Sequence, residues 1–128
     1  MCKGLIKMML LLCVGATNIQ AKVLDLTGKP IIRLTGVVDK SILSKMRVLN
    51  KIKGKKVVLL INSPGGDVYP GLQFIDAMEA VKTRGVKITC VVSNMAASMA
   101  FQILSKCDSR YSLANSLLLW HPMKLRVS

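Results

Sequence analysis

The chain has 128 residues, of which 52% are hydrophobic and 20% charged, a balance typical of one folded domain and not of a disordered chain. With one Trp, two Tyr and two Phe, it lacks the aromatic residues from which a base-stacking surface for nucleic acid is built. The formal net charge of +13 predicts a strongly basic surface.

The first 21 residues have the pattern of a secretory signal peptide. Lysines without any acid in residues 1–7 precede an apolar run over residues 8–14, and small residues follow at Ala16 and Ala21. This run is shorter than the about 20 residues that a bilayer span needs. We therefore expect an exported protein, cleaved after Ala16 or Ala21, with one domain over residues 22–128. The alternatives are a misplaced start codon or an apolar N-terminal helix, and a cytoplasmic location.

The first half of this domain reads as strand, helix, strand. Residues 31–38 are β-branched and apolar, and residues 57–62, after Lys55 and Lys56, form a second apolar run. Between them, residues 39–53 place apolar side chains at helical spacing, with Asp39 as the expected cap. The many lysines and arginines from Lys40 to Lys56 are then the solvated side of an amphipathic helix, so we expect no nucleic-acid partner.

The second half continues the alternation. We expect a helix around residues 72–81 that ends at Gly85, a strand over residues 86–92, a helix over residues 98–106 and short strands at residues 110–113 and 117–120. The runs V-V-L-L-I and I-T-C-V-V are apolar without alternation, as in strands covered on both faces. The pattern predicts the α/β class.

Cysteine and histidine usage indicates no metal site. Cys2 and Cys13 lie in the predicted leader, and Cys90 lies in an apolar run, where a thiol usually serves as a small buried hydrophobe. Cys107 has no obvious partner. A Cys90–Cys107 bond is conceivable in an exported protein, but two cysteines do not predict one. One histidine and scattered cysteines cannot form a four-ligand site, so we expect no metal and no cofactor.

Three short motifs carry the candidate chemistry. Gly65 and Gly66 follow the second strand and allow backbone amides to point at a developing oxyanion. Ser98 lies between small residues where the third strand gives way to a helix, a junction that exposes a hydroxyl. His121 is the only histidine and hence the only histidine available as a base. Each motif alone has a plainer interpretation, respectively a tight turn, a helix cap and a surface side chain.

Taken in order, these motifs resemble the ClpP family of serine peptidases. The resemblance extends over residues 34–123 and rests on T-G-V-V-D at 35–39, I-N-S-P-G-G at 61–66, M-A-A-S-M-A at 95–100 and A-N-S followed by H-P within 114–122. It implies a ClpP/crotonase-like fold, a spiral of repeated β-β-α type with a mostly parallel sheet, incomplete here at the C-terminus. The implied reaction is hydrolysis of a peptide bond through an acyl-enzyme.

The resemblance also assigns roles. It implies a nucleophile at Ser98, a general base at His121, oxyanion-hole amides at Gly66 and Met99, and substrate binding by Gly65, Asp67 and Val68. It further implies a peptide or unfolded-protein substrate and a homo-oligomer in the full-length relative. An AAA+ unfoldase would be a partner only of a cytoplasmic form.

One catalytic group has no match. In the family an aspartate downstream of the histidine orients the imidazole, whereas no acidic residue follows His121 in this sequence. Asp67 and Asp108 are the upstream substitutes. Loss of such an acid costs about four powers of ten in turnover. We therefore expect a truncated product or a partial sequence of a peptidase.

Two other functions stay open. A non-catalytic subunit could assemble with complete homologues, although nothing would then require both Ser98 and His121. A crotonase-like acyl-CoA enzyme shares the fold and its oxyanion amides but needs no serine nucleophile. Signal peptidases of the SppA type are similar too, but they pair serine with lysine.

Overall fold

The computed structural model describes residues 10–13 and 21–122 of the chain, with side-chain environments from Val23 onward. Residues 123–128, at the end of the predicted domain, lie outside this part. The elements follow in this order: β1 (Leu10–Cys13), β2 (Ala21–Val23), β3 (Ile31–Thr35), α2 (Ile42–Asn50), β4 (Lys56–Ser63), α3 (Val68–Thr83), β5 (Lys87–Ala97), α4 (Met99–Ser105), β6 (Ser109–Leu113) and β7 (Leu117–Leu119).

The strands form a 7-stranded, mostly parallel sheet. Its order is β2-β1-β6-β5-β4-β3, and β7 pairs with β5 away from this path. Strands β3 to β6 are mutually parallel, β7 is parallel to β5, and only β1 pairs antiparallel with its neighbours. The predicted α/β class and the mostly parallel ClpP-like sheet are therefore confirmed.

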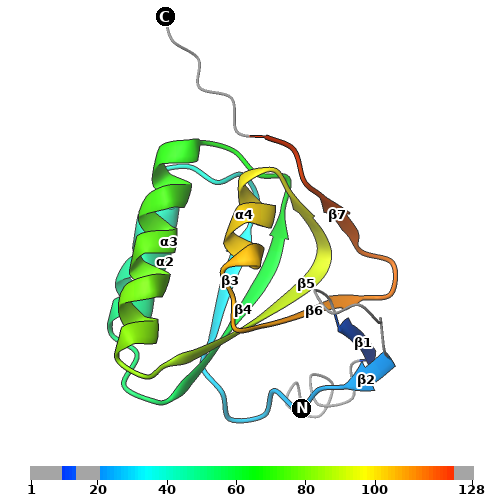
Figure 1. Cartoon of the computed structure of the whole chain (residues 1–128), viewed down its shortest axis with the longest axis horizontal. Coiled ribbons are helices and arrows are strands. Elements are labelled where there is room, and N and C mark those ends of the chain that lie inside the picture. Colours follow the sequence, from blue (N-terminus) through cyan, green and yellow to red (C-terminus); the bar gives the residue numbers. More distant parts are fainter. Residues whose placement is uncertain (1–9, 14–20, 123–128) are drawn as a thin grey trace, which may run out of the picture.

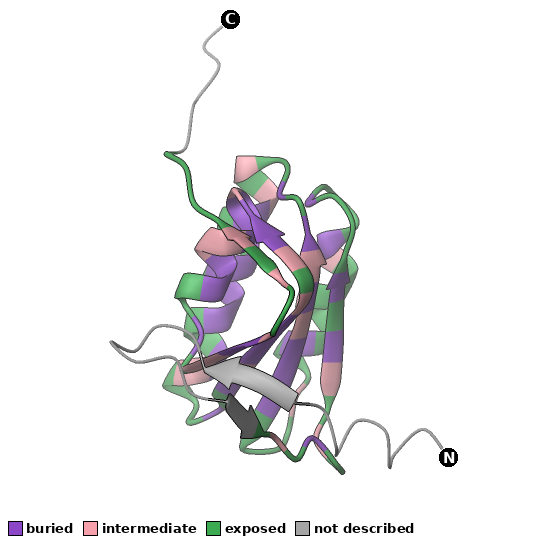
Figure 2. Cartoon of the chain, turned by 90° about the vertical axis from the view of Figure 1, so that its right-hand side faces the viewer, coloured by how far each residue is buried: buried purple, intermediate pink, exposed green. Residues whose placement is uncertain are grey.

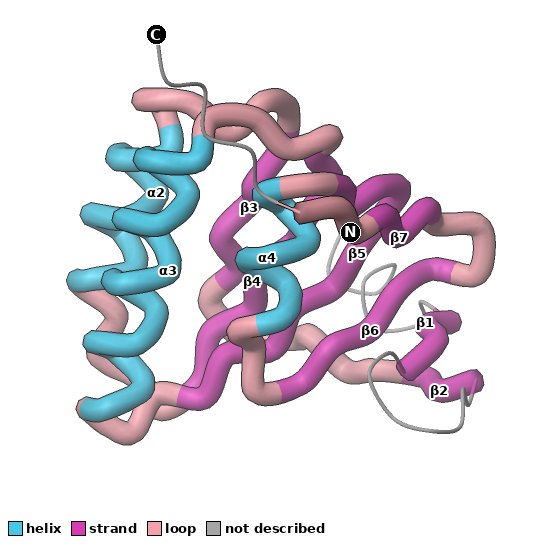
Figure 3. The backbone as a smooth tube through the Cα atoms, turned by 45° about the horizontal axis from the view of Figure 1, so that its top comes forward, coloured by secondary structure: helices cyan, strands magenta, loops and turns pink. Residues whose placement is uncertain are grey.

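Helices α2, α3 and α4 cover one face of the sheet (Figures 1 and 3). Helix α3 buries Phe74, Ile75, Met78 and Val81, a stripe at helical spacing, against β4 and β5. The central strands β4 and β5 contribute side chains to the clusters on both faces, which explains their unbroken apolar runs. In Figure 2 the buried residues gather where helices and sheet face one another. Burial of one large side chain here is worth about 2–3 kcal/mol.

Helix α2 has the predicted amphipathic pattern. Ile42 and Leu49 are buried, whereas Lys45 and Arg47 are exposed. The predicted cap was wrong by two residues, since Ser41 and not Asp39 occupies the N-cap position. Asp39 instead accepts hydrogen bonds from the hydroxyl (2.6 Å) and amide (2.8 Å) of Ser41, and these bonds hold the pKa of its carboxyl below the usual value.

Strand β5 is longer than the sequence predicted. Residues 93–97 were expected to be a loop, but the strand continues to Ala97. Met95, Ala96 and Ala97 pair with β7, and Ser63 of β4 pairs with Ala96 after a register shift. Pairing with β7, a contact distant in sequence, supplies hydrogen bonds that local propensity does not encode.

Part of the predicted signal peptide belongs to the sheet. Leu10–Cys13 forms β1, which pairs with β2 and with β6, and Ala21 is the first residue of β2. Ala16 lies outside the described residues. Cleavage after either predicted point would remove β1 and leave β6 at the edge of the sheet. No helix among the described residues is long and apolar enough to cross a membrane.

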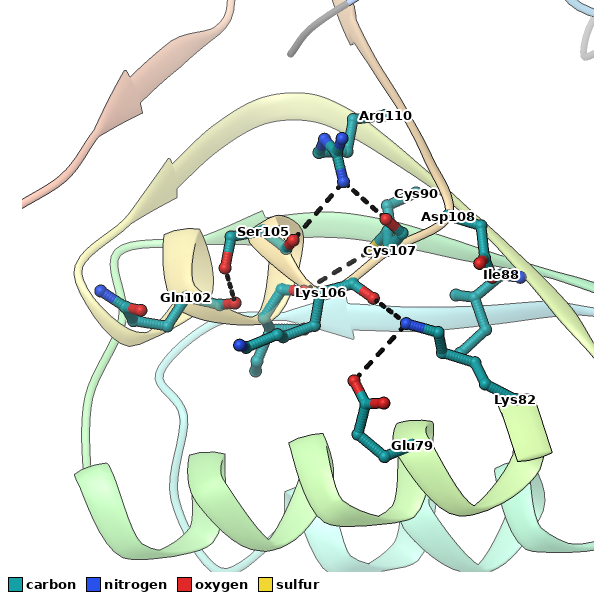
Figure 4. Close-up of polar contacts among 11 residues, drawn as sticks. Glu79, Lys82, Ile88, Cys90, Gln102, Ser105, Lys106, Cys107, Asp108 and Arg110 are labelled. Carbon is teal, nitrogen blue, oxygen red and sulfur yellow. Dashed lines mark hydrogen bonds and ion pairs between the residues drawn. A yellow bond between two sulfur atoms is a disulfide. The ribbon is translucent and has the colours of Figure 1, made fainter.

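A disulfide joins Cys90 of β5 to Cys107, which follows α4. Both residues are buried, and their Cα atoms are 6.0 Å apart. Figure 4 shows the polar contacts around this end of α4, where Arg110 donates to the Cys107 carbonyl and Lys82 donates to the Lys106 carbonyl (3.0 Å). The bond closes a loop with a sequence separation of 17, and Ser98 lies inside that loop.

Removing the disulfide should destabilise the fold. Closing a loop of this length restricts the unfolded chain, so Cys90→Ala/Cys107→Ala should lower the free energy of unfolding by about 3 kcal/mol in chemical denaturation. Reductant should lower the stability of the wild type toward that of the double variant and leave the double variant unchanged. A wild-type midpoint unaffected by reductant, with both thiols shown to be free, would contradict this expectation.

Candidate active site

The ends of three parallel strands bring the predicted site residues to one edge of the sheet. Ser63 ends β4 and pairs with Ala96 of β5, so the loop after β4 and the turn after β5 start side by side. Beyond β3, Val38 forms a parallel bridge with Gly66. In α/β sheets, this carboxyl edge is where ligands bind.

The backbone of Ser98 is held in a rare conformation. Its φ of 57° and ψ of −123° make it the single non-glycine residue with positive φ in the described part of the chain. Such a conformation costs about 1–3 kcal/mol and persists only where the surroundings enforce it. The Ser98 amide donates to the Leu119 carbonyl (3.0 Å), and the Ser98 carbonyl accepts from Phe101 (3.0 Å) and Gln102 (3.2 Å). Ser98 is therefore fixed at a sharp strand-to-helix turn, with its side chain only half-buried.

Gly65 lies directly against this turn. A Cβ atom at Gly65 would lie 2.6 Å from the Ala97 carbonyl oxygen and 2.6 Å from the Ser98 Cβ, distances that atoms do not tolerate. Its φ of +98° also disfavours any L side chain. The buried hydroxyl of Ser63 accepts a hydrogen bond from the Gly65 amide (3.1 Å), and this bond fixes the conformation of the loop. Only glycine allows the loop to approach the serine this closely.

The hydrogen bonds around Gly66 orient its amide. The Val38 amide donates a hydrogen bond to the Gly65 carbonyl (2.8 Å), and the Val38 carbonyl accepts one from the Asp67 amide (2.7 Å). Since both neighbours face Val38, the N–H of Gly66 itself points to the opposite side, which is the side of β5 and Ser98. No backbone partner of this N–H occurs among the described residues.

A second unpaired amide lies beside the first. Met99 is the first residue of α4, and its N–H has no acceptor in the described backbone. The Met99 side chain is buried on Gly71 of α3, where a Cβ would collide with it. Gly66 and Met99 each adjoin the Gly65–Ser98 contact, so two free amides flank the serine. Gly66 and Met99 are therefore the candidate oxyanion donors.

His121 follows β7 on the exposed surface. Two residues before it, Leu119 binds the Ser98 amide, which brings this segment to the site. The His121 Nδ1 lies 3.0 Å from the Pro122 carbonyl oxygen. If Nδ1 donates this bond, the neutral ring carries its lone pair on Nε2, the nitrogen that would accept a proton. No hydrogen bond joins Ser98 and His121 in the described structure, and such bonds often form only when substrate is bound.

The two upstream acids differ in position. Asp108 accepts the Ile88 amide (2.8 Å) at the start of β5, roughly 30 Å of strand away from Ser98. It is therefore too distant to orient His121. Asp67 is exposed at the N-cap of α3, close to the glycine loop, and Val68 after it packs on the core. In the described structure the Asp67 carboxylate makes no ion pair with His121.

Sequence reasoning missed two backbone contacts of the site. Val38 bonds both sides of Gly66, and the Leu119 carbonyl holds the Ser98 amide. Both contacts are made by backbone atoms, so the residue type at position 119 could not indicate that Leu119 belongs to the site. For Val38, the preceding Gly36, with a φ of 86°, was the one local indication of a turn toward the glycine loop.

Comparison with known proteins agrees with this arrangement. The family described as Clp protease matches residues 14–126. The chain is 33% identical over 97 residues to the ATP-dependent Clp protease proteolytic subunit of Carsonella ruddii, a match covering 71% of this chain and 48% of that protein. It is 33% identical over 102 residues to subunit 3 of Streptomyces avermitilis, covering 75% of this chain and 45% of that protein.

A solved structure is similar as well. The ClpP protease catalytic domain from Plasmodium falciparum superposes with a TM-score of 0.60 and 29% identity, covering 70% of this chain and 53% of that one. The chain thus belongs to the Clp protease family, and it spans about half the length of the relatives it matches.

The close approach of Gly65 gives a direct test of the site. Gly65→Ala should lose at least about 2–3 kcal/mol of unfolding free energy, because the added methyl meets Ala97 and Ser98 at an unfavourable φ. Gly28→Ala is the matched control, since Gly28 also has positive φ (+74°) but nothing within 4 Å of its Cβ position. It should lose only about 1 kcal/mol. Equal losses in denaturant titrations would show that the contact is not tight.

The strain at Ser98 predicts an unusual pair of variants. Ser98→Gly relieves the backbone strain, whereas Ser98→Ala retains it, so the glycine variant should be about 1–2 kcal/mol more stable than the alanine variant. At an unstrained exposed position such as Ser105, glycine should instead be less stable than alanine by about 1 kcal/mol. Thermal or denaturant unfolding measures both differences, and an alanine variant more stable than the glycine variant at position 98 would argue against a strained turn.

Proposed function

We propose that this chain carries the active site of a serine endopeptidase. The proposal rests chiefly on one observation, a strained Ser98 in contact with Gly65 and flanked by the free amides of Gly66 and Met99. Membership of the Clp protease family supports it.

In the proposed reaction, the Ser98 Oγ attacks the substrate carbonyl carbon while its proton passes to Nε2 of His121. The negative charge that develops on the carbonyl oxygen is held by the amides of Gly66 and Met99. His121 then protonates the leaving amine, and an ester between Ser98 and the acyl part of the substrate remains. Water, deprotonated by His121, hydrolyses this ester and restores the serine.

Substrate would bind as an extended strand along the glycine loop. The Gly66 amide points toward Ser98, and the exposed backbone continues through Asp67 to Val68 at the start of α3. Gly65, Asp67 and Val68 are the proposed substrate-binding residues. The Gly65 and Asp67 amides are already bonded to Ser63 and Val38, so pairing with the substrate main chain would use the Val68 amide, which has no backbone acceptor among the described residues. The substrate class is a peptide or unfolded protein.

The identity of the orienting acid stays open within this proposal. The Pro122 carbonyl contacts Nδ1, but it carries no charge with which to stabilise an imidazolium. An acid supplied by residues beyond this sequence, or by a second subunit, would raise turnover by about four powers of ten. A homo-oligomer is the proposed assembly of the full-length relative.

The proposed location is outside the cytoplasm. The leader pattern supports it, as does the buried Cys90–Cys107 disulfide, since such bonds persist in oxidising compartments. In that location no ATP-driven unfoldase would assist. If mass spectrometry of the protein taken from cells finds Met1 retained and both thiols free, this part of the proposal fails.

An active-site-directed fluorophosphonate probe tests the chemistry. The wild type should be labelled on Ser98, Ser98→Ala should not be labelled, and His121→Ala should be labelled roughly 100-fold or more slowly because no base removes the proton. Ser105→Ala, on the same helix, should label like the wild type. A folded wild-type protein that remains unlabelled would favour a non-catalytic subunit.

A further inference from the structure

Strand β3 ends the sheet and has one open side. Among the described residues it pairs only with β4, through the register from Ile31↔Val58 to Thr35↔Asn62. Two flanking bonds fix the phase of this ladder: the Val58 amide donates to Pro30 (2.9 Å), and the Gly36 amide donates to Asn62 (2.9 Å). Even-numbered residues therefore face β4, and the N–H and C=O groups of Ile31, Arg33 and Thr35 face outward.

A groove runs along this open edge, between β3 and helix α2. One hollow of about 120 Å³ is lined by residues 33–38 together with Ser41, Ile42, Ser44, Lys45 and, at the end of β4, Ser63. A second hollow, of about 280 Å³, adjoins it and is lined by residues 31–33 with Lys45 and Val48. Arg33 and Lys45 line both hollows, so these two cations mark the middle of the groove.

The groove carries two cations that pair with no acid in the part of the chain that the structure describes. Arg33 and Lys45 are exposed, and neither takes part in an ion pair or side-chain hydrogen bond within the described residues. Asp39, next to the groove-lining Val38 and Ser41, is a charged carboxylate, but it bonds Ser41 and forms no ion pair with Arg33 or Lys45. The groove therefore combines unpaired main-chain groups with unpaired positive charge.

The unpaired main-chain groups and the positive charge together restrict which kind of strand can pair with the β3 edge. Pairing of two β3 edges would place like charges opposite each other, an arrangement that destabilises a sheet and that proteins use to prevent edge-to-edge association. An acidic strand would satisfy the same main-chain groups and offset the charge. Strand addition of this kind draws affinity from the main chain and specificity from alternate side chains.

We propose that the β3 edge binds an extended, acidic segment of a partner protein by strand addition, with acidic side chains beside Arg33 and Lys45. The proposal does not rest on the peptidase function. The groove follows the edge of β3, two strands from β5, and shares only Val38 and Ser63 with the surroundings of the glycine loop. A segment in the groove thus leaves Ser98 accessible, and the site would recruit a protein rather than cleave it.

Fluorescence polarisation of a short labelled peptide of alternating Glu and Val tests the proposal on the full chain. The peptide should bind, and a peptide of alternating Lys and Val should not. Arg33→Glu and Lys45→Glu should each weaken binding by roughly tenfold or more, because they place like charges opposite the peptide. Arg47→Glu is the matched control on α2, outside both hollows, and should leave the affinity within about twofold.

Strand addition is separated from simple charge attraction by hydrogen exchange. Bound peptide should slow exchange of the Arg33 and Thr35 amides, which face outward, and leave the Leu34 amide, already paired with β4, unchanged. Thr35→Pro removes one outward donor without removing a β4 bond and should weaken the peptide by several-fold in a chain that circular dichroism shows to be folded. Equal binding of the Lys-Val peptide, no loss in Arg33→Glu, or unchanged exchange at Arg33 and Thr35 would each overturn the proposal.

Discussion

The contact between the backbone of Gly65 and the turn at Ser98 is the constraint on which the site depends. It requires β4 and β5 to end together, the loop after β4 to consist of glycine at the contact, and Ser98 to accept a strained backbone. In return it places the amides of Gly66 and Met99 on either side of a half-buried hydroxyl. The rest of the fold, with α3 and α4 packed on one face of the sheet, holds these two segments against each other. Met99 takes part both in the packing of the helices and in the site, because its side chain packs on Gly71 of α3 while its amide remains free.

Much of this arrangement could be predicted from the sequence because it is local. Apolar runs without alternation identified β4 and β5, helical spacing identified α2 and α3, and the glycine pair and Ser98 marked the two turns. The parts that could not be predicted depend on residues distant in the chain. Residues 93–97 carry small and polar side chains typical of a loop, yet pairing with β7 extends β5 through them. The Cys90–Cys107 bond likewise depends on how α4 returns to the sheet, which spacing alone does not give.

The position of the acids limits what this chain can do by itself. Parallel strands place their starts and ends at opposite edges of a sheet, and Asp108 lies at the start of β5 while Ser98 follows its end. No change of rotamer could bring that carboxylate to His121. The described structure therefore contains a strained serine turn and free amides beside it, but no acid paired with His121. In this fold the backbone that positions the serine is thus independent of the acid that would assist proton transfer by His121.

The disulfide also decides what a break in the backbone would do. The loop closed by Cys90 and Cys107 contains the entire turn from β5 into α4. A cut anywhere within that loop leaves both halves joined by the disulfide, so the nicked molecule gains only the mass of one water and separates into two fragments only when it is reduced. In the presence of another protease, the disulfide thus prevents a single cut in the serine turn from releasing a fragment.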